Sequence, residues 1–309
     1  MHHTLRASQL RFEAGDPEHA EGHRRCALVD GSTGSVHMGL GLCQLDSGGR
    51  FDLHVHSFEE SFYVLEGAPT LILDGRCIGL EPGVCGLVPI GTVHAWLGPE
   101  TGSAEWVEIA SPQPRAPDLP KDTFFLDGAL DCEPAADLDV RDPRLPHFSR
   151  FDESDMQLDR LKKAVPIDAP TESASMATAL LAYGGITVKR LVDQRLDAQL
   201  LTMFMVEYQP GGAAQLHDHT FEEAYLMLEG ELETVADGEH YLLAPGDVFW
   251  TGVGCIHSFT NASGRSVRFL EVQAPQPPRR YPYRFNRDWD YLEARLDSEA
   301  QCAPRQIPS

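Results

Sequence analysis

The sequence predicts an all-β protein made of two homologous halves, and three observations support this prediction. The segment Leu53–Gly67 (LHVHSFEESFYVLEG) recurs as Leu216–Gly230 (LHDHTFEEAYLMLEG), with nine of 15 positions identical at an offset of 163 residues. Around both copies, short runs rich in β-branched and aromatic residues alternate with period two, as half-buried strands do. Glycine, Asp-Gly or Pro-Gly interrupts these runs at roughly 8–12 residue intervals. We therefore expect an antiparallel sandwich or barrel in each half.

The same offset extends over about 50 residues of each half without a net insertion. Between the copies, residues 111–172 carry nine prolines, which cannot continue a central strand. This stretch is interpreted as an extended, partly packed connection, so the predicted domains are residues 1–153 and 154–309. Amphipathic patterns predict two short helices, at Glu153–Ala164 and Asp288–Leu296.

Composition narrows the class of protein and of partner. The 309 residues are 42% hydrophobic and 23% charged, as in a folded protein, and the formal net charge of −22 argues against nucleic acid or an anionic membrane as partner. No run of 18 apolar residues and no signal-peptide pattern are visible, so we expect a cytoplasmic protein. The expected partner is a small-molecule substrate, and association into a homo-oligomer is left open.

Cysteine usage indicates buried thiols rather than a disulfide framework. There are seven cysteines, an odd number, and none has CxxC spacing. Most are predicted to be small buried hydrophobic residues. Cys255 differs because it lies two residues before His257, one of the histidines considered next.

Histidines and a glutamate at repeated spacing predict a metal site in each half. His54 and His56 are two residues apart on a predicted strand, so both side chains project from one face, about 6.5–7 Å apart along the chain. Glu60 follows four residues later, and His94 follows two further strands. The second half repeats this set as His217, His219, Glu223 and His257. Three imidazoles and one carboxylate suit Fe, Mn, Ni, Cu, Co or Zn and leave coordination positions open.

Each half contains two adjacent glutamates, and only one of each pair can face the histidines. We assign Glu60 and Glu223 as the ligands, because the family motif that these segments resemble, named below, places its glutamate seven residues before a glycine. Glu59 and Glu222 are then expected to face solvent, or to contact a ligand side chain without binding the metal themselves.

These segments resemble the paired motifs of the cupin superfamily. The first copy has Gly48, His54-Val55-His56, Glu60 and Gly67, then Gly83, Pro89-Ile90-Gly91 and His94; the second has Gly211, His217-Asp218-His219, Glu223 and Gly230, then Gly246, Gly252-Val253-Gly254, His257 and Asn261. Each copy departs once from the pattern, with Gly98 in place of asparagine and Gly252 in place of proline. The resemblance implies a bicupin with two jelly-roll barrels, each holding one divalent transition metal through three histidines and one glutamate.

The resemblance leaves the reaction open among three hypotheses. The leading one is a dioxygenase similar to quercetinase-like bicupins, because the predicted inward neighbours (Phe62, Val64, Trp96, Tyr225, Met227 and Phe259) favour a small apolar or aromatic substrate. Glu60 and Glu223 are then candidate bases as well as ligands. The alternatives are a manganese hydrolase resembling ureidoglycine aminohydrolase and a non-catalytic binding protein. Since only the second copy keeps the motif asparagine, at Asn261, the motifs favour the C-terminal site for catalysis.

Overall fold

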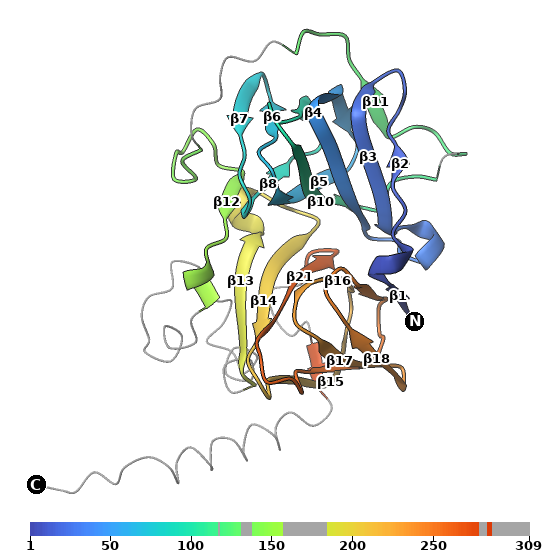
Figure 1. Ribbon diagram of the computed structural model, residues 1–309. Coiled ribbons are helices and arrows are strands. Elements are labelled where there is room, and N and C mark those ends of the chain that lie inside the picture. Colours follow the sequence, from blue (N-terminus) through green and yellow to red (C-terminus); the bar gives the residue numbers. More distant parts are fainter. Residues whose placement is uncertain (117, 131–137, 157–183, 278–282, 286–309) are drawn as a thin grey trace, which may run out of the picture.

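The chain forms two β-barrels, one from each half of the sequence (Figure 1). The computed structural model describes residues 1–116, 118–130, 138–156, 184–277 and 283–285. The predicted all-β class and the tandem arrangement are confirmed. Within the described ranges the helices are four 3₁₀ turns of three or four residues: η1 Ala7–Gln9, η2 Gly31–Thr33, η3 Glu153–Met156 and η4 Gln194–Leu196.

The N-terminal barrel is one curled sheet of eleven strands. Its main path runs through β12 Phe148–Arg150, β8 Val84–Val88, β5 Glu59–Glu66, β10 Ser103–Ser111, β4 Gly39–His56, β9 His94–Leu97, β6 Thr70–Leu73 and β7 Arg76–Gly79. Three further strands extend it through β4: β3 Ala20–Val29, β2 Glu13–Ala14 beyond it, and β11 Thr123–Phe125. Because β4 is 18 residues long, it pairs with β10 through its first part and with β9 through its last part, and so closes the barrel.

The C-terminal barrel consists of two sheets. One contains β1 His2–Leu5, β19 Val248–Thr251, β16 Glu222–Glu229, β21 Val267–Ala274, β14 Thr202–Tyr208 and β13 Ile186–Val192. The other contains β18 Glu239–Leu243, β17 Leu232–Ala236, β20 His257–Thr260, β15 Ala213–His219 and β22 Tyr283–Phe285. Here the counterpart of β4 is broken into β14 and β15, which divides the barrel into two sheets.

The two helix predictions have different outcomes. Of Glu153–Ala164, only the first four residues are described, and they form the 3₁₀ turn η3. Asp288–Leu296 lies outside the described residues. The proline-rich connection is packed in part, as expected, because β11 pairs with β4 and β12 pairs with β8.

Each barrel also receives a strand from beyond its own repeat. The N-terminal strand β1 pairs antiparallel with β19 of the C-terminal barrel, and β12, which precedes the second repeat, pairs antiparallel with β8 of the N-terminal barrel. Strands β8 and β19 are equivalent under the 163-residue offset. Figure 1 accordingly shows the N-terminus beside the C-terminal barrel. This reciprocal exchange joins the two halves through backbone hydrogen bonds.

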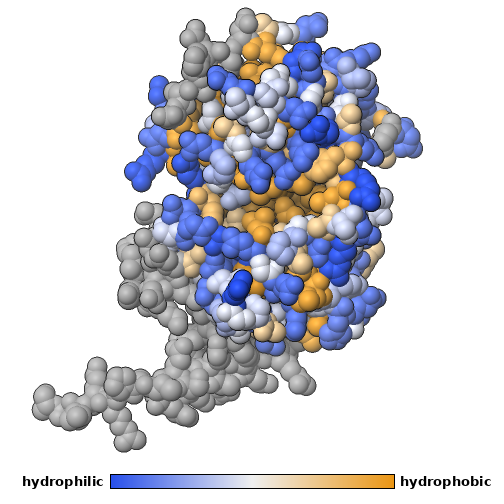
Figure 2. Space-filling model, in the orientation of Figure 1, coloured by the Kyte–Doolittle hydropathy of each residue, from blue (hydrophilic) through white to orange (hydrophobic). Residues whose placement is uncertain are grey.

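Strands β5 and β16 are buried on both faces. On β5, Phe62 and Val64 pack inside the N-terminal barrel, whereas Tyr63 belongs to a cluster shared with the other barrel. On β16, Tyr225 and Met227 pack inside the C-terminal barrel, and the alternate residues join the same shared cluster. The molecule thus has three apolar clusters, one inside each barrel and one between them, and Figure 2 shows hydrophobic residues gathered where the barrels meet. All six predicted inward neighbours of the histidines lie inside the barrels.

Glu59 and Glu222 do not face solvent, contrary to the expectation for them. Each is 3% exposed, because the outer face of its strand is covered by the other barrel. The Glu59 carboxylate accepts hydrogen bonds from the backbone N–H groups of Gln199, at 2.6 Å, and Leu200, at 2.8 Å.

The Glu222 carboxylate of the C-terminal barrel makes the equivalent contacts to the N-terminal half. It accepts from the Ser35 hydroxyl at 2.5 Å and from the Val36 N–H at 2.9 Å. The offset of 163 residues relates Glu59 to Glu222, and it relates the donor Val36 to the donor Gln199. These two reciprocal contacts satisfy buried backbone donors on both sides of the barrel interface.

Backbone conformation explains why glycine occupies the motif positions Gly67 and Gly230. Both adopt positive φ, 75° and 73°, at the end of the strand that carries the glutamate. A Cβ atom at Gly67 would lie 2.2 Å from the Ser103 carbonyl oxygen, and one at Gly230 would lie 2.8 Å from the Ser266 carbonyl oxygen. Only glycine fits these turns without strain.

Four cysteines confirm the prediction of buried free thiols: Cys26, Cys43, Cys85 and Cys255. Cys77 is an exception, because it takes part in a disulfide bond. No helix in the described ranges is long and apolar enough to cross a membrane.

The reciprocal carboxylate contacts predict a specific loss of stability. Replacing Glu222 with alanine removes the acceptor of the Val36 N–H and leaves the Ser35 hydroxyl only the Met38 carbonyl, so we expect the free energy of unfolding to fall by about 1–3 kcal/mol. Urea denaturation measures this change. Glu233→Ala, on an exposed position of β17, is the control. Equal midpoints for the two variants would contradict a stabilising role of Glu222.

Candidate metal centres

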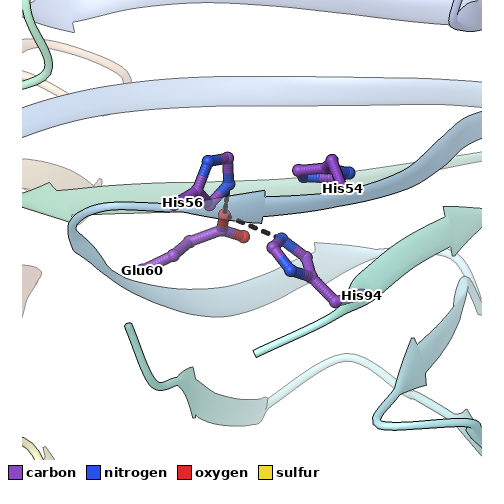
Figure 3. Close-up of side chains that lie close together, drawn as sticks. All are labelled: His54, His56, Glu60 and His94. Carbon is purple, nitrogen blue, oxygen red and sulfur yellow. Dashed lines mark hydrogen bonds and ion pairs between the residues drawn. The ribbon is translucent and has the colours of Figure 1, made fainter. Parts of the chain in front are cut away.

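The first predicted ligand set comes together inside the N-terminal barrel. His54 and His56 lie at the end of β4, Glu60 near the start of β5, and His94 at the start of β9, where it is in register with His54. All four are at least 93% buried, and one ligand atom from each lies within 4.8 Å of the others. Figure 3 shows the three imidazoles around the carboxylate, whose Oε2 is 2.8 Å from His56 Nε2 and 3.4 Å from His94 Nε2.

The second set repeats this arrangement in the C-terminal barrel. His217 and His219 lie on β15, Glu223 on β16 and His257 on β20, with His217 in register with His257. Glu223 Oε2 is 2.7 Å from His219 Nε2 and 3.4 Å from His257 Nε2. The structure therefore brings together both groups of four residues that the spacing predicted.

Hydrogen bonds orient the six imidazoles in a common way. Five of the Nδ1 atoms lie 2.6–3.0 Å from main-chain carbonyl oxygens, to which an Nδ1–H group donates: His54 to Asp52, His94 to Thr92, His217 to Gln215, His219 to Phe221 and His257 to Cys255. His56 Nδ1 lies 3.0 Å from the hydroxyl of Thr123 on β11. In the tautomer with the proton on Nδ1, which a bound metal would select, the Nε2 lone pairs are directed inward. Metal-binding histidines are oriented by such outer contacts.

The electrostatics of the sets favour a bound cation. Burial, together with the neighbouring His94 and His56, lowers the pKa of His54 to about 2, so this imidazole is neutral and available as a ligand. Its Nε2 atom is buried and has no hydrogen-bond partner within the described part of the chain. Burial alone would raise the pKa of Glu60, but the hydrogen bonds from His56 and His94 lower it well below its usual range. Imidazole nitrogens grouped around a carboxylate form a donor set that fits a divalent transition metal.

Polar groups around the second site were not foreseen from the sequence. The Tyr225 hydroxyl donates to Glu223 Oε2 and lies 3.3 Å from His257 Nε2. The Gln273 side-chain amide donates to the other carboxylate oxygen, Oε1, at 2.8 Å. At the equivalent positions of the first site stand Phe62 and Ala110, so the two sites share their ligands but differ in what surrounds them.

A cavity of about 540 Å³ lies between the N-terminal segment and β3, near the first site, and its polar lining includes Arg11, Arg25, Glu13, Asp16 and Asp30. Phe51 connects the two: its ring stacks on His23, with centroids 4.7 Å apart, and contacts the ring of His54 at 4.5 Å. Phe125 on β11 also lines the cavity, 5.7 Å from the His54 ring. The His23 Nδ1 atom is buried without a hydrogen-bond partner in the described ranges, and burial lowers the pKa of this imidazole.

Arg25 places a guanidinium in this cavity. Its Nε donates to the Glu108 carboxylate, which raises the pKa of Arg25 further, so the group is charged at any ordinary pH. The side chain lies directly against Gly41, where a Cβ atom would be only 2.5 Å from Arg25 Nη2. Glycine at this position is therefore required for the arginine to lie across β4.

The C-terminal barrel is filled at the same positions. Under the offset of 163, the counterparts of His23, Arg25 and Gly41 are Ile186, Val188 and Phe204. All three pack in the apolar cluster of that barrel. One barrel has thus kept a polar cavity beside its ligands where the other has a packed core.

Sequence reasoning missed Arg25 and His23 because they precede the motifs and have no polar counterpart in the other half. The two arginines that it considered, Arg50 and Arg76, do not reach inward. Arg50 pairs with Asp52 at 2.7 Å, and Arg76 donates to the Arg144 carbonyl at the surface. The one available signal was that alternate residues of a strand share a face, which places Arg25 on the inward face of β3.

The two ligand sets predict a metal stoichiometry. His54→Ala and His217→Ala should each bind one equivalent of divalent metal less than the unaltered protein, and the double variant two less, because each removes one of four ligands. Elemental analysis and calorimetric titration with Mn²⁺ measure this. His240→Ala, at an exposed position on β18, should bind the full complement. Retention of both equivalents by either single variant would contradict the assignment of that site.

The lowered histidine pKa values predict a pH dependence of the metal-free protein. The pKa of His217 falls to about 3, chiefly through burial, and that of His54 to about 2, against 6.5 for an ordinary histidine. Between these limits the unfolded state binds more protons than the folded state, so stability should decrease as pH falls from about 6.5 toward 3. Urea unfolding in chelator at pH 7 and pH 5 tests this. His217→Asn should show a smaller difference than the unaltered protein, and an equal or larger one would contradict the prediction.

Comparison with known proteins agrees with the geometry. The profile of the cupin domain family matches residues 41–110 and 204–273, once in each barrel. The HTH-type transcriptional regulator PuuR, from Escherichia coli (strain K12) and from Shigella flexneri, is 32% identical over 92 residues, which are 29% of this chain and 49% of the regulator. The chain thus spans about half the length of the curated relatives it matches.

Solved structures show the two-barrel fold at low sequence identity. A salicylate 1,2-dioxygenase from Pseudoaminobacter salicylatoxidans, in complex with gentisate, superposes with a TM-score of 0.65 at 16% identity, covering 89% of this chain and 82% of that enzyme. Oxalate decarboxylases from Bacillus subtilis and Lactobacillus farciminis both give 0.61 at 16% identity, covering 99% of this chain and 87% and 96% of their own. With a cupin domain in each half and a potential metal-ligand set in each barrel, the chain belongs to the cupin superfamily and is a bicupin.

Proposed function

We propose that this protein is a metal-dependent oxygenase of the dioxygenase type, acting on a small aromatic carboxylate in the N-terminal barrel. One observation carries the proposal: a buried set of three histidines and one glutamate lies near a cavity whose lining includes Phe51, Phe125 and the guanidinium group of Arg25, with Arg11 also on its wall. Oxygenases of this kind need an open metal position next to a site that holds the substrate.

The metal would be held by His54, His56, Glu60 and His94, and the equivalent set in the C-terminal barrel would hold a second one. The bound metal would supply Lewis acidity and redox chemistry toward substrate and O₂. The choice among Fe, Mn and the other candidate metals is left to measurement. The protein's own contribution is to fix the imidazoles through their Nδ1 contacts and to exclude water.

Substrate recognition follows from the lining of the cavity. Phe51 and Phe125 offer aromatic surface, and the Arg25 fork has N–H groups beyond the one that donates to Glu108. A planar fork binds carboxylates in two-point fashion. The salicylate dioxygenase that shares the fold acts on an aromatic carboxylate, by its name, which supports the same substrate class here.

Glu60 is the proposed base for a substrate hydroxyl. It is ionised, lies among the ligands and faces the barrel interior, so its carboxylate can accept a proton when its contact to a neighbour loosens. Glu223 has the same position in the other barrel. Because Tyr225 and Gln273 already occupy its two oxygens, we propose a supporting role for the C-terminal site rather than turnover.

This choice of site differs from the one that Asn261 suggested. The Asn261 side chain is fully buried and donates to three backbone carbonyls, those of Tyr208, Gln209 and Arg265. It holds a turn together, and turn rigidity does not bear on which barrel reacts. The cavity beside the N-terminal site is the more direct indication.

Decarboxylation of a small carboxylate at the same site is the second candidate. Arg25 favours it as well, since its guanidinium binds any carboxylate, and oxalate decarboxylases share the fold. Net O₂ consumption separates the two reactions. Ammonia release from a ureido compound would instead support the hydrolase hypothesis, and a protein purified free of metal would support a binding function.

The experiment is O₂ uptake by the metal-loaded protein with a panel of hydroxybenzoates and their uncharged analogues. We expect uptake with the carboxylates, its loss in His54→Ala and its retention in His217→Ala. No uptake with any aromatic substrate tried, or equal activity with substrates lacking the carboxylate, would overturn the proposal.

Arg25→Lys tests the substrate class separately. Loss of the two-point contact should raise KM for a carboxylate by about tenfold, which corresponds to about 1.4 kcal/mol. Arg24→Lys is the matched control, because Arg24 is the next residue on β3, is 42% exposed and pairs with Asp46. An unchanged KM in Arg25→Lys would rule out carboxylate binding by this residue.

A further inference from the structure

A third group of metal-binding side chains lies outside both histidine–glutamate sets. It consists of His2 on the exchanged strand β1, Asp237 in the turn between β17 and β18, and Cys255 just before β20. One ligand atom from each lies within 4.8 Å of the others. The three residues are remote in sequence and meet only because β1 crosses to the C-terminal barrel.

Asp237 is at the centre of this group. Its Oδ2 atom lies 3.5 Å from His2 Nδ1 and 3.5 Å from Cys255 Sγ. Cys255 is fully buried and the His2 side chain is 11% exposed, while Asp237 is 39% exposed and gives the group access to solvent. The α-amino group of Met1 also contacts Asp237 Oδ2, at 2.8 Å.

The hydrogen bonds of His2 determine which ring nitrogen carries the proton. The Tyr241 hydroxyl donates to Glu239 Oε2 at 2.7 Å, so it is an acceptor toward His2 Nε2, also at 2.7 Å. The neutral ring therefore has its proton on Nε2 and a lone pair on Nδ1. That Nδ1 atom is shielded from solvent and faces the carboxylate of Asp237, whose Oδ2 lies 3.5 Å away. A cation bound between Nδ1 and Oδ2 would be coordinated by both atoms.

We propose that His2, Asp237 and Cys255 form a third metal site, which takes a divalent ion of zinc-like character. An imidazole nitrogen, a carboxylate oxygen and a thiolate sulfur are the ligand types that Zn²⁺ binds in tetrahedral sites. Water would complete the four ligands. Binding replaces the thiol proton of Cys255 by the metal, with no change of oxidation state.

A metal bound at this site would cross-link separate segments of the fold. One bound ion would connect β1, the β17–β18 turn and the segment leading to β20, and so fasten the exchanged strand to the barrel that receives it. The role does not depend on the reaction proposed for the N-terminal barrel. It also gives Cys255 a function distinct from that of its neighbour His257.

Among the residues that the structure describes, the N-terminal barrel has no such group at the equivalent position, and it supplies a matched control. The residues equivalent to Asp237 and Cys255 are Asp74 and Thr92. Asp74 occupies the same turn with the same positive φ, 49° against 48° at Asp237. Asp74→Asn therefore repeats the charge change of Asp237→Asn in a turn that lacks the other two ligands.

Cobalt substitution tests the proposal, because both histidine–glutamate sets lack sulfur. Protein without an added N-terminal tag is freed of metal and titrated with Co²⁺ under reducing conditions. We expect thiolate-to-cobalt charge-transfer absorption that saturates at one equivalent and is displaced by Zn²⁺. Cys255→Ser and His2→Ala should abolish this absorption and lower the bound metal by one equivalent. Asp74→Asn should leave both unchanged.

Two results would overturn the third site. One is the absence of charge-transfer absorption in protein whose two histidine–glutamate sets are filled with cobalt, as their d–d spectrum and two bound equivalents would show. The other is absorption that persists in both Cys255→Ser and His2→Ala, which would assign it to a different thiol. His2→Ala changes a side chain near the surface, so retention of the other two equivalents verifies that the variant is folded.

Discussion

The structure depends on the face-to-face packing of two sheets whose central strands, β5 and β16, are buried on both sides. One face of each strand contributes to the interior of its own barrel, and the other contributes to the apolar cluster between the barrels. Adjacent glutamates on these strands consequently have opposite tasks. Glu60 and Glu223 face the histidines, whereas Glu59 and Glu222 accept hydrogen bonds from the opposite barrel.

Duplication preserved the ligands and allowed their surroundings to diverge. In the N-terminal barrel, Gly41 makes room for Arg25, and a polar cavity remains beside the first site. In the C-terminal barrel, Phe204 and Val188 fill that space, and Tyr225 and Gln273 hold the glutamate instead. Since small barrels are normally filled by side chains, the cavity is the departure on which the proposal of a reacting N-terminal site rests.

Exchange of terminal strands links the two barrels in a second way. Strand β1 reaches the C-terminal barrel and β12 reaches the N-terminal one, so neither half closes its sheet from its own repeat alone. The exchange also assembles His2, Asp237 and Cys255, residues more than 200 positions apart at the extreme. Candidate metal ligands in this protein therefore have two sources: the repeated motif inside each barrel, and a contact that exists only because β1 crosses to the C-terminal barrel.

The sequence alone determined the strand content, the duplication and all eight residues of the two candidate ligand sets, because strand periodicity and motif spacing are local properties that place i and i+2 side chains on one face. It did not reveal that Glu59 and Glu222 are buried, that Arg25 and His23 line a cavity, or that β1 joins the other half. These features arise from contacts between segments distant in the chain, and no local pattern records which surface will cover an outward face. Tertiary packing decided them, since a side chain on the outer face of a sheet is exposed or buried according to what packs against it.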